Sequence, residues 1–551
     1  MGGTYHAIRL SEDQNPAIDS RDYADDEHEA QPADEVTYNT PQRRPRWQTA
    51  GAKSLSILKH IRFFLPSYLH QRDPAGGRER KLHPTAYLDA LRGYAAVCVF
   101  IYHAFHLPNI WFLQLPIIRV FFDGGSGMVA IFFVISGYVL SYRMLQMIRN
   151  KQAARLHDCL ASSTFRRFIR LYGSTGVATL VAAIMVTLRW YIPYGMNPQP
   201  TFWAQLWDWF LDFAVTCNPF ADIQGWVHDG VFRTRYLDQM WTIPIEYRGS
   251  IILFVFCAAS SKLSTMSRWI FLWIVVALAY WWRAVYVAEF LFGMFVADLS
   301  LSRHPERLGG HAAATTTTLP PPQPLPVVVM TANDQVAIVQ PEVGEEGESG
   351  SEGESEEERE IMQEKLFASS SAQHRLRRHR RRLVAIASTI GWVSVLLLGF
   401  ILLGQPDRQH TPDLGATDGQ FPWPILARMI PPWYGDAAYT FWISFGAFFV
   451  VLALDSCPIL QRPFEWRFSQ YLGDLSFGIY AMHWPIVYGP YRLVIEPWRA
   501  AHLGESHLAR LPGALLTALV VLWVADYFTR VDKMVVRSAR WLQNKTFIKW
   551  D

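Results

Sequence analysis

The stretch YLDALRGYAAVCVFIYHAFH, residues 87–106, has the pattern of a membrane-spanning helix, yet it carries four ionisable side chains. About 20 mostly apolar residues are enough for a helix to cross the hydrocarbon core of a bilayer. The ionisable residues are Asp89, Arg92, His103 and His106. Because one charge near the bilayer centre costs about 3 kcal/mol on insertion scales, four such residues in one span indicate partners or a function.

The composition of the whole chain also indicates a membrane protein. Half of its 551 residues are hydrophobic and 22 are Trp, which departs well from an ordinary soluble chain. The formal net charge of +3 is too small to indicate nucleic-acid binding by itself, so we expect no nucleic-acid partner. The five cysteines are scattered and show no metal-ligand spacing, so we expect no metal site.

Apolar runs of about 20 residues recur along the chain, and they predict an all-α integral membrane bundle of about ten transmembrane helices. The ten runs lie near residues 86–107, 121–146, 172–192, 240–260, 268–283, 285–303, 383–404, 436–454, 472–492 and 511–531. The fifth run is short, and WDWFLDFAVTCNPF at 207–220 has the pattern of an amphipathic interfacial or re-entrant piece. Nine or eleven crossings therefore stay open.

The remaining segments are polar and define the expected domain organisation. Residues 1 to about 50 and 304 to about 373 lack the hydrophobic residues that a packed core requires, so both are predicted to be disordered. The expected parts are a polar N-terminal region (1–60), six helices (86–303), a disordered acidic and basic loop (304–382), four helices (383–531) and a tail (532–551).

The distribution of Lys and Arg predicts the orientation. Basic residues gather before the first run, between the second and third runs and after the last one, and short loops rich in Lys and Arg stay in the cytosol. With ten spans, both termini are then expected in the cytosol of a multi-pass protein of an endomembrane or the plasma membrane. The basic cluster at 374–382 is either an anchor for this orientation or a site for anionic lipid headgroups.

The polar residues of the predicted spans indicate a shared internal site. Arg92 and His103 are eleven residues apart, which places them within roughly 20° on one helix face and about 16 Å apart along it. This arrangement suits a long substrate that lies along the helix. Ser136, Glu246 and His483 lie in three other predicted spans, and polar groups on several spans suggest one polar cavity inside the bundle.

Each of these residues also has a purely structural interpretation. Asp89 precedes Arg92 by three residues and can pair with it on the helix surface, while Arg248 can neutralise Glu246.

A transporter or proton-coupled channel would use the same buried polar residues as a path through the membrane. A scaffold that recruits partners through its acidic loop would leave those residues unexplained.

Six segments resemble, in order, the motifs of the acyltransferase 3 family of polytopic membrane enzymes, and the resemblance covers nearly all of the region from Tyr87 to about Phe528. They are LDALRGYAAVCVFIYH, GMVAIFFVISGYVL, FRRFIRLYGS, MWTIPIEYRGSI, EFLFGMFVADLS and YLGDLSFGIYAMHWPI. The first resembles the family's Arg and His separated by ten residues, and the third resembles its RxxR element through Arg167 and Arg170. The Pro that usually follows the Tyr of that element is replaced by Gly173.

The resemblance implies an O-acyltransferase with ten core helices. It would transfer an acyl group, typically acetyl, from acyl-CoA to a hydroxyl of a carbohydrate or another small molecule. His103 would be the catalytic base and Glu246 would orient it, while an acyl-histidine intermediate stays open. Arg92, Arg167 and Arg170 would bind the phosphates of coenzyme A. Ser136 and His483 would complete the substrate-binding residues.

Overall fold

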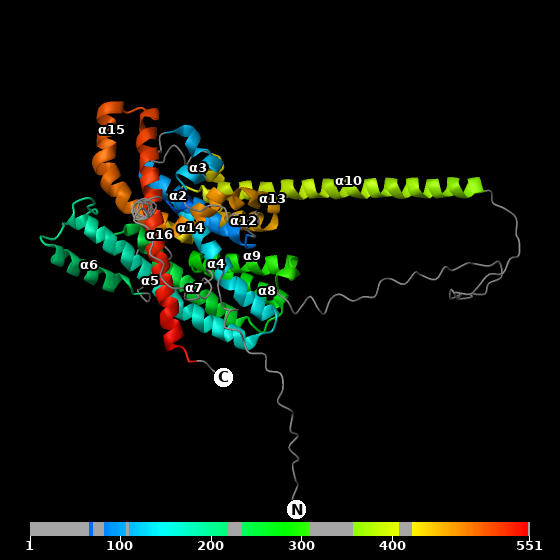
Figure 1. The fold of residues 1–551 in the computed structure, drawn as a ribbon, viewed down its shortest axis with the longest axis horizontal. Helices are drawn as coiled ribbons and strands as arrows, with labels where there is room; N and C mark the ends of the chain where they lie inside the picture. The colour runs from blue at the N-terminus through cyan, green and yellow to red at the C-terminus, as the bar shows by residue number, and fades with distance from the viewer. Residues whose placement is uncertain are drawn as a thin grey trace, which may run out of the picture. The chain divides into compact units, whose positions relative to one another are not determined.

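The computed structural model describes residues 66–69, 82–105, 110–218, 234–308, 356–406 and 421–548. These residues belong to one compact unit, Leu65–Asp551, and in the described part of the chain they form helices and no strand (Figure 1). The predicted disorder of residues 1–60 and of 309–355 lies outside the described residues, as does His106.

Every predicted apolar run overlaps a helix. The ten helices are α2 (Ala86–Phe105), α4 (Gly125–Arg149), α5 (Ala153–Thr187), α7 (Thr242–Ala259), α8 (Thr265–Trp281), α9 (Val285–Arg303), α10 (Glu356–Leu403), α12 (Thr440–Ser456), α14 (Arg467–Ile486) and α16 (Leu511–Thr546). Among the described residues, eight of them are long and apolar enough to cross a membrane. Helix α8 has only 17 residues, and α14 is not among the eight, so the predicted count of ten is approximate.

Short helices connect these elements. They are η1 (Ser67–Leu69), η2 (Trp111–Gln114), α3 (Pro116–Phe122), α6 (Phe202–Thr216), η3 (Asp238–Trp241), η4 (Pro305–Leu308), α11 (Trp423–Arg428), η6 (Pro432–Tyr439), α13 (Pro458–Gln461), η7 (Arg462–Glu465), the π-helix η8 (Val487–Ile495), α15 (Glu496–Leu503) and η9 (Leu508–Arg510). Helix α6 covers most of the predicted amphipathic piece, begins at the N-cap Thr201 and is too short to cross a bilayer. It exposes Trp203, Trp207 and Phe210, as expected of an interfacial helix.

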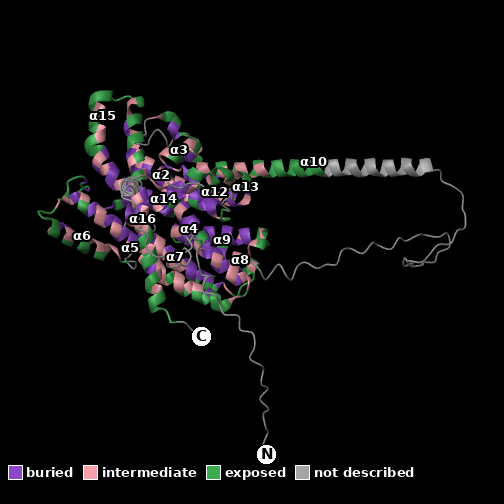
Figure 2. Cartoon of the chain, in the orientation of Figure 1, coloured by how far each residue is buried: buried purple, intermediate pink, exposed green. Residues whose placement is uncertain are grey.

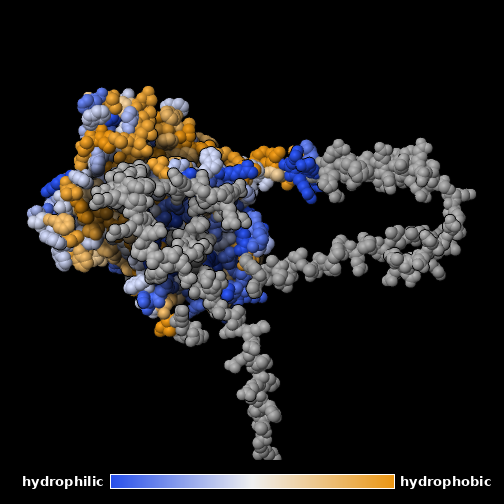
Figure 3. Space-filling view, in the orientation of Figure 1, coloured by the Kyte–Doolittle hydropathy of each residue, from blue (hydrophilic) through white to orange (hydrophobic). Residues whose placement is uncertain are grey.

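Two helices extend beyond the predicted bounds. Helix α10 begins at Glu356, so residues 356–382 of the predicted disordered loop are helical; their Glu, Gln, Lys, Ala and Arg content favours this conformation. Helix α16 continues to Thr546, so most of the predicted tail is part of the last helix. The outward side of α16 is apolar, with Leu515 and Leu519 exposed, and Figure 3 shows a mostly apolar surface around α15 and α16, as expected of helices that face lipid.

Close contacts between glycine and backbone determine the core of the bundle. Helix α14 packs most extensively against α2, and α4 packs against α9; buried residues gather where these helices meet (Figure 2). A Cβ atom on Gly93 would lie 2.3 Å from the backbone of Leu472, and one on Gly293 would lie 2.0 Å from that of Val134. Small residues let membrane helices approach this closely. The contact between α2 and α14 fixes the register of the polar residues on these two helices.

Candidate active site

Five of the seven predicted site residues line one cavity of about 170 Å³. They are Arg92 on α2, Ser136 on α4, Arg167 and Arg170 on α5, and Glu246 on α7. The four helices bring together residues that lie up to 154 positions apart in the sequence. The polar groups of different spans therefore share one internal space, as the sequence pattern indicates.

The carboxylate of Glu246 is held by hydroxyl and guanidinium groups. Arg167 donates from Nη2 to Glu246 Oε1, and Ser136 Oγ donates to the same oxygen at 2.6 Å. Arg167 also donates from Nε to Ser250 Oγ at 2.8 Å, and this hydroxyl donates to the main-chain oxygen of Glu246 at 2.6 Å. These contacts fix the fork of Arg167 against the cavity wall. That Glu246 orients His103 stays a prediction.

Arg92 and Arg170 have a different environment from Arg167. Both interact electrostatically with Asp89, in line with the local pairing of Asp89 and Arg92 that the sequence allows. The Nε atom of Arg92 is buried and has no hydrogen-bond partner among the described residues. A buried donor without a partner is costly, so this guanidinium is ready to accept a ligand in the cavity.

Asp532 on α16 is a cavity residue that the sequence interpretation missed, because it assigned residues 532–551 to a tail. The hydroxyl of Ser174, which also lines the cavity, donates to Asp532 Oδ1. Helix α5 runs without interruption through Gly173, and a Cβ atom there would lie 2.9 Å from Val535 Cγ1. The four-residue spacing of Val531, Val535 and Ala539 was the available signal that α16 continues and packs.

The histidines form a second cluster outside this lining. The rings of His103 and His483 are stacked, with centroids 5.4 Å apart and planes 21° apart. Trp484 meets the His103 ring edge-on at 4.8 Å. His483 is fully buried; its Nδ1 lies 3.1 Å from the main-chain oxygen of Ile479, and its Nε2 has no hydrogen-bond partner among the described residues. The structure thus pairs the two predicted histidines and separates them from the arginines.

Tyr480 touches both clusters. It lines the cavity, and its ring centroid is 6.1 Å from that of His483, which follows three residues later on α14. Its hydroxyl lies 2.7 Å from Thr242 Oγ1 and donates to the main-chain oxygen of Gln239. Tyr480 and Thr242 lie inside two of the family-like segments, and Gln239 directly precedes one of them. The sequence does not single them out, because tyrosine, threonine and glutamine are ordinary residues in membrane helices.

The chain is similar to known acyltransferases. A family profile described as an acyltransferase domain matches residues 85–318, which include the cavity residues of α2, α4, α5 and α7. The O-acetyltransferase PaAT-1 of Phomopsis amygdali is 28% identical over 517 residues, or 88% of each chain. The acyltransferase clz18 of Cochliobolus lunatus is 23% identical over 506 residues, which cover 81% of this chain and 91% of the relative. No solved structure matches the chain.

Proposed function

Because the chain belongs to the acyltransferase 3 family and is an O-acyltransferase, we propose that it transfers an acyl group from acyl-CoA to a hydroxyl of a small molecule or carbohydrate. Acetyl is the acyl group we favour, because one relative is named an O-acetyltransferase. The observation that carries this proposal is the cavity lined by Arg92, Arg167 and Arg170, three guanidinium groups from helices α2 and α5.

The arginine cavity is the donor site in this proposal. Guanidinium groups match the oxygens of phosphate in geometry and charge, and coenzyme A carries several phosphates. Arg167 is fixed by Glu246 and Ser250, so Arg92 and Arg170 supply most of the free donors for these phosphates. Three positive side chains face two negative ones, Glu246 and Asp532, and the excess favours an anionic ligand.

The histidine pair is the site of chemistry. His103 takes the proton of the acceptor hydroxyl, while the oxygen of that hydroxyl forms a bond to the carbonyl carbon of the thioester. The carbon–sulfur bond then breaks, and the thiolate of coenzyme A leaves and receives the proton. An unperturbed imidazole pKa near 6.5 suits a base that works around neutral pH. His483 stacks on His103 and restricts the orientation of its ring.

The positions of these two sites along α2 indicate from which side of the membrane the donor and the acceptor enter. Arg92 lies near the start of α2 and His103 near its end, about 16 Å further along the axis. With both termini in the cytosol, as the distribution of Lys and Arg predicts, the donor enters from the cytosol and the acceptor meets His103 nearer the opposite face.

The test uses purified protein, acetyl-CoA with a labelled acetyl group, and a deproteinised cell extract as the source of acceptors. We expect release of free thiol together with a labelled product that mild alkali cleaves, as it does an ester. The same protein in sealed vesicles provides the contrast with a transporter. Accumulation of unchanged labelled donor inside the vesicles, without ester or thiol, would contradict the proposed function.

A further inference from the structure

The lining of the donor cavity changes from charged to aromatic over about one helical turn. At one level Ser136 of α4 donates to Glu246 of α7, and Arg167 donates to the same carboxylate. Four residues earlier on the same two helices lie Phe132 and Thr242, which also line the cavity. Four residues correspond to about 6 Å along a helix. The cavity therefore passes from a charged level to an aromatic level over the length of a few bonds.

The aromatic level is closed by two rings from facing helices. The ring of Phe132 lies 6.2 Å from that of Tyr480 on α14, with planes inclined by 59°. Tyr480 is fixed because its hydroxyl contacts both Thr242 and the main-chain oxygen of Gln239. Gln239 in turn donates from Nε2 to the main-chain oxygen of Ala481 at 3.3 Å. Phe132 and Tyr480 thus form a wall of the cavity, and the hydrogen bonds of Thr242 and Gln239 hold Tyr480 in place.

Tyr480 connects this wall to the histidine pair. Tyr480 lines the cavity on one side, and its ring is 6.1 Å from that of His483 on the other. His483 stacks on His103. A thioester whose phosphates are held by Arg92 and Arg170 reaches the histidines only with its acyl end at the level of Phe132 and Tyr480.

We propose that Phe132 and Tyr480 form an aromatic stop that limits the donor to a short acyl chain such as acetyl. The inference rests on the proposed function, because it assigns the acyl end of acyl-CoA to this part of the cavity. Close-packed interiors do not yield to extra methylene groups without strain, so a longer chain would collide with the two rings. One added methylene in such a pocket changes a rate by about 10-fold or more.

The experiment measures the rate of thiol release with acetyl-, butanoyl- and hexanoyl-CoA for the parent and for Phe132→Ala. The parent is expected to prefer acetyl-CoA over hexanoyl-CoA by at least about 10-fold. Removing the Phe132 ring is expected to raise the relative rate with hexanoyl-CoA at least about 10-fold while acetyl transfer persists. Phe132→Leu, which removes less volume, is expected to shift the preference in the same direction by a smaller factor.

Phe441→Ala is the matched control, because Phe441 is also partly buried but lies on α12 and packs against Tyr434 away from the cavity. It should leave the chain-length preference of the parent unchanged. Folding of each variant is verified by extracted abundance and gel filtration. If Phe132→Ala fails to fold, Phe132→Leu decides.

The outcomes distinguish failure of the aromatic stop from failure of the proposed function. A folded Phe132 variant that transfers acetyl with the parent's chain-length preference overturns the aromatic stop, and so does a parent that uses hexanoyl-CoA as fast as acetyl-CoA. A parent that releases no thiol from any donor overturns the proposed function instead.

Discussion

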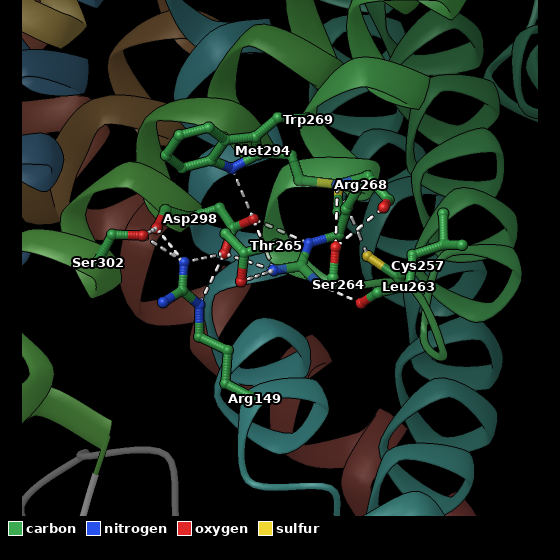
Figure 4. A network of polar contacts seen from close by, with 11 residues as sticks. Arg149, Cys257, Leu263, Ser264, Thr265, Arg268, Trp269, Met294, Asp298 and Ser302 are labelled. Atoms are coloured by element: carbon green, nitrogen blue, oxygen red, sulfur yellow. Dashed lines mark hydrogen bonds and ion pairs between the residues drawn. The ribbon is translucent and has the colours of Figure 1, made fainter.

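Two clusters in this protein combine arginine with a carboxylate, but they have different roles. In the cavity, Arg167 donates to Glu246, and Arg92 beside it keeps a buried Nε without a partner among the described residues. At the ends of α4, α8 and α9, Asp298 is surrounded by donors (Figure 4). Arg149 and Arg268 each donate to it from Nε at 2.8 Å, and Trp269 donates at 3.0 Å.

The difference between the two clusters is whether donors are left over. Arg268 is 1% exposed, and its guanidinium also contacts the main-chain oxygen of Leu263 and the hydroxyl of Thr265. Neither oxygen of Asp298 lacks a donor, so this cluster holds three helices together and offers nothing to a ligand. A buried ion pair therefore indicates a binding site only when a cavity and unused donors accompany it.

The first prediction concerns the Asp298 cluster, in which every carboxylate oxygen has a donor. Asp298→Ala would leave the buried Arg268 and the largely buried Arg149 without their counter-charge, which costs about 3–5 kcal/mol of stability. We expect a sharp loss of extracted folded protein and a lower unfolding temperature in detergent. Asp298→Asn, which keeps an acceptor oxygen, should lose less. Normal abundance and thermal stability of Asp298→Ala would show that the cluster does not hold the helices together.

The second prediction concerns the arginine cluster of the cavity. Arg92→Ala removes a guanidinium with an unused donor, so the protein should fold normally while the KM for acetyl-CoA rises roughly 10- to 100-fold. Arg92→Lys should restore only part of the affinity, because an ammonium group cannot form the planar fork. An unchanged KM in a folded Arg92→Ala protein would remove Arg92 from the donor site.

The third prediction concerns the charge balance of the cavity. Asp532→Asn removes a negative charge that faces the proposed anionic donor, while its amide oxygen can still accept from Ser174. Repulsion of the donor should decrease, so its KM should fall by a factor of about 2 to 5, which is the size of a partly screened charge interaction. A rise in KM would mean that Asp532 helps to bind the donor.

The sequence was sufficient for the helices and for one side of the site. Apolar runs locate all ten helices, and Arg92, Ser136 and Glu246 stand out because polar groups in spans are costly. Arg167 and Arg170 stand out only through the resemblance to the RxxR element. Arg149 belongs to the basic segment between the second and third apolar runs, and the sequence does not indicate its partner Asp298, which is 149 residues away. The pairing of His103 with His483 and the position of Asp532 depend on how α2, α14, α5 and α16 pack, which no local pattern records.

In the proposed mechanism the arginines bind the donor, and His103 removes the proton of the acceptor. The decisive measurement compares coenzyme A binding with acyl-transfer turnover in folded His103→Ala protein. We predict that the Kd for coenzyme A stays within about twofold of the parent's, while turnover falls roughly 100-fold or more because the base is gone. A folded His103→Ala enzyme that turns over like the parent would contradict the account, and the histidine pair would then be structural.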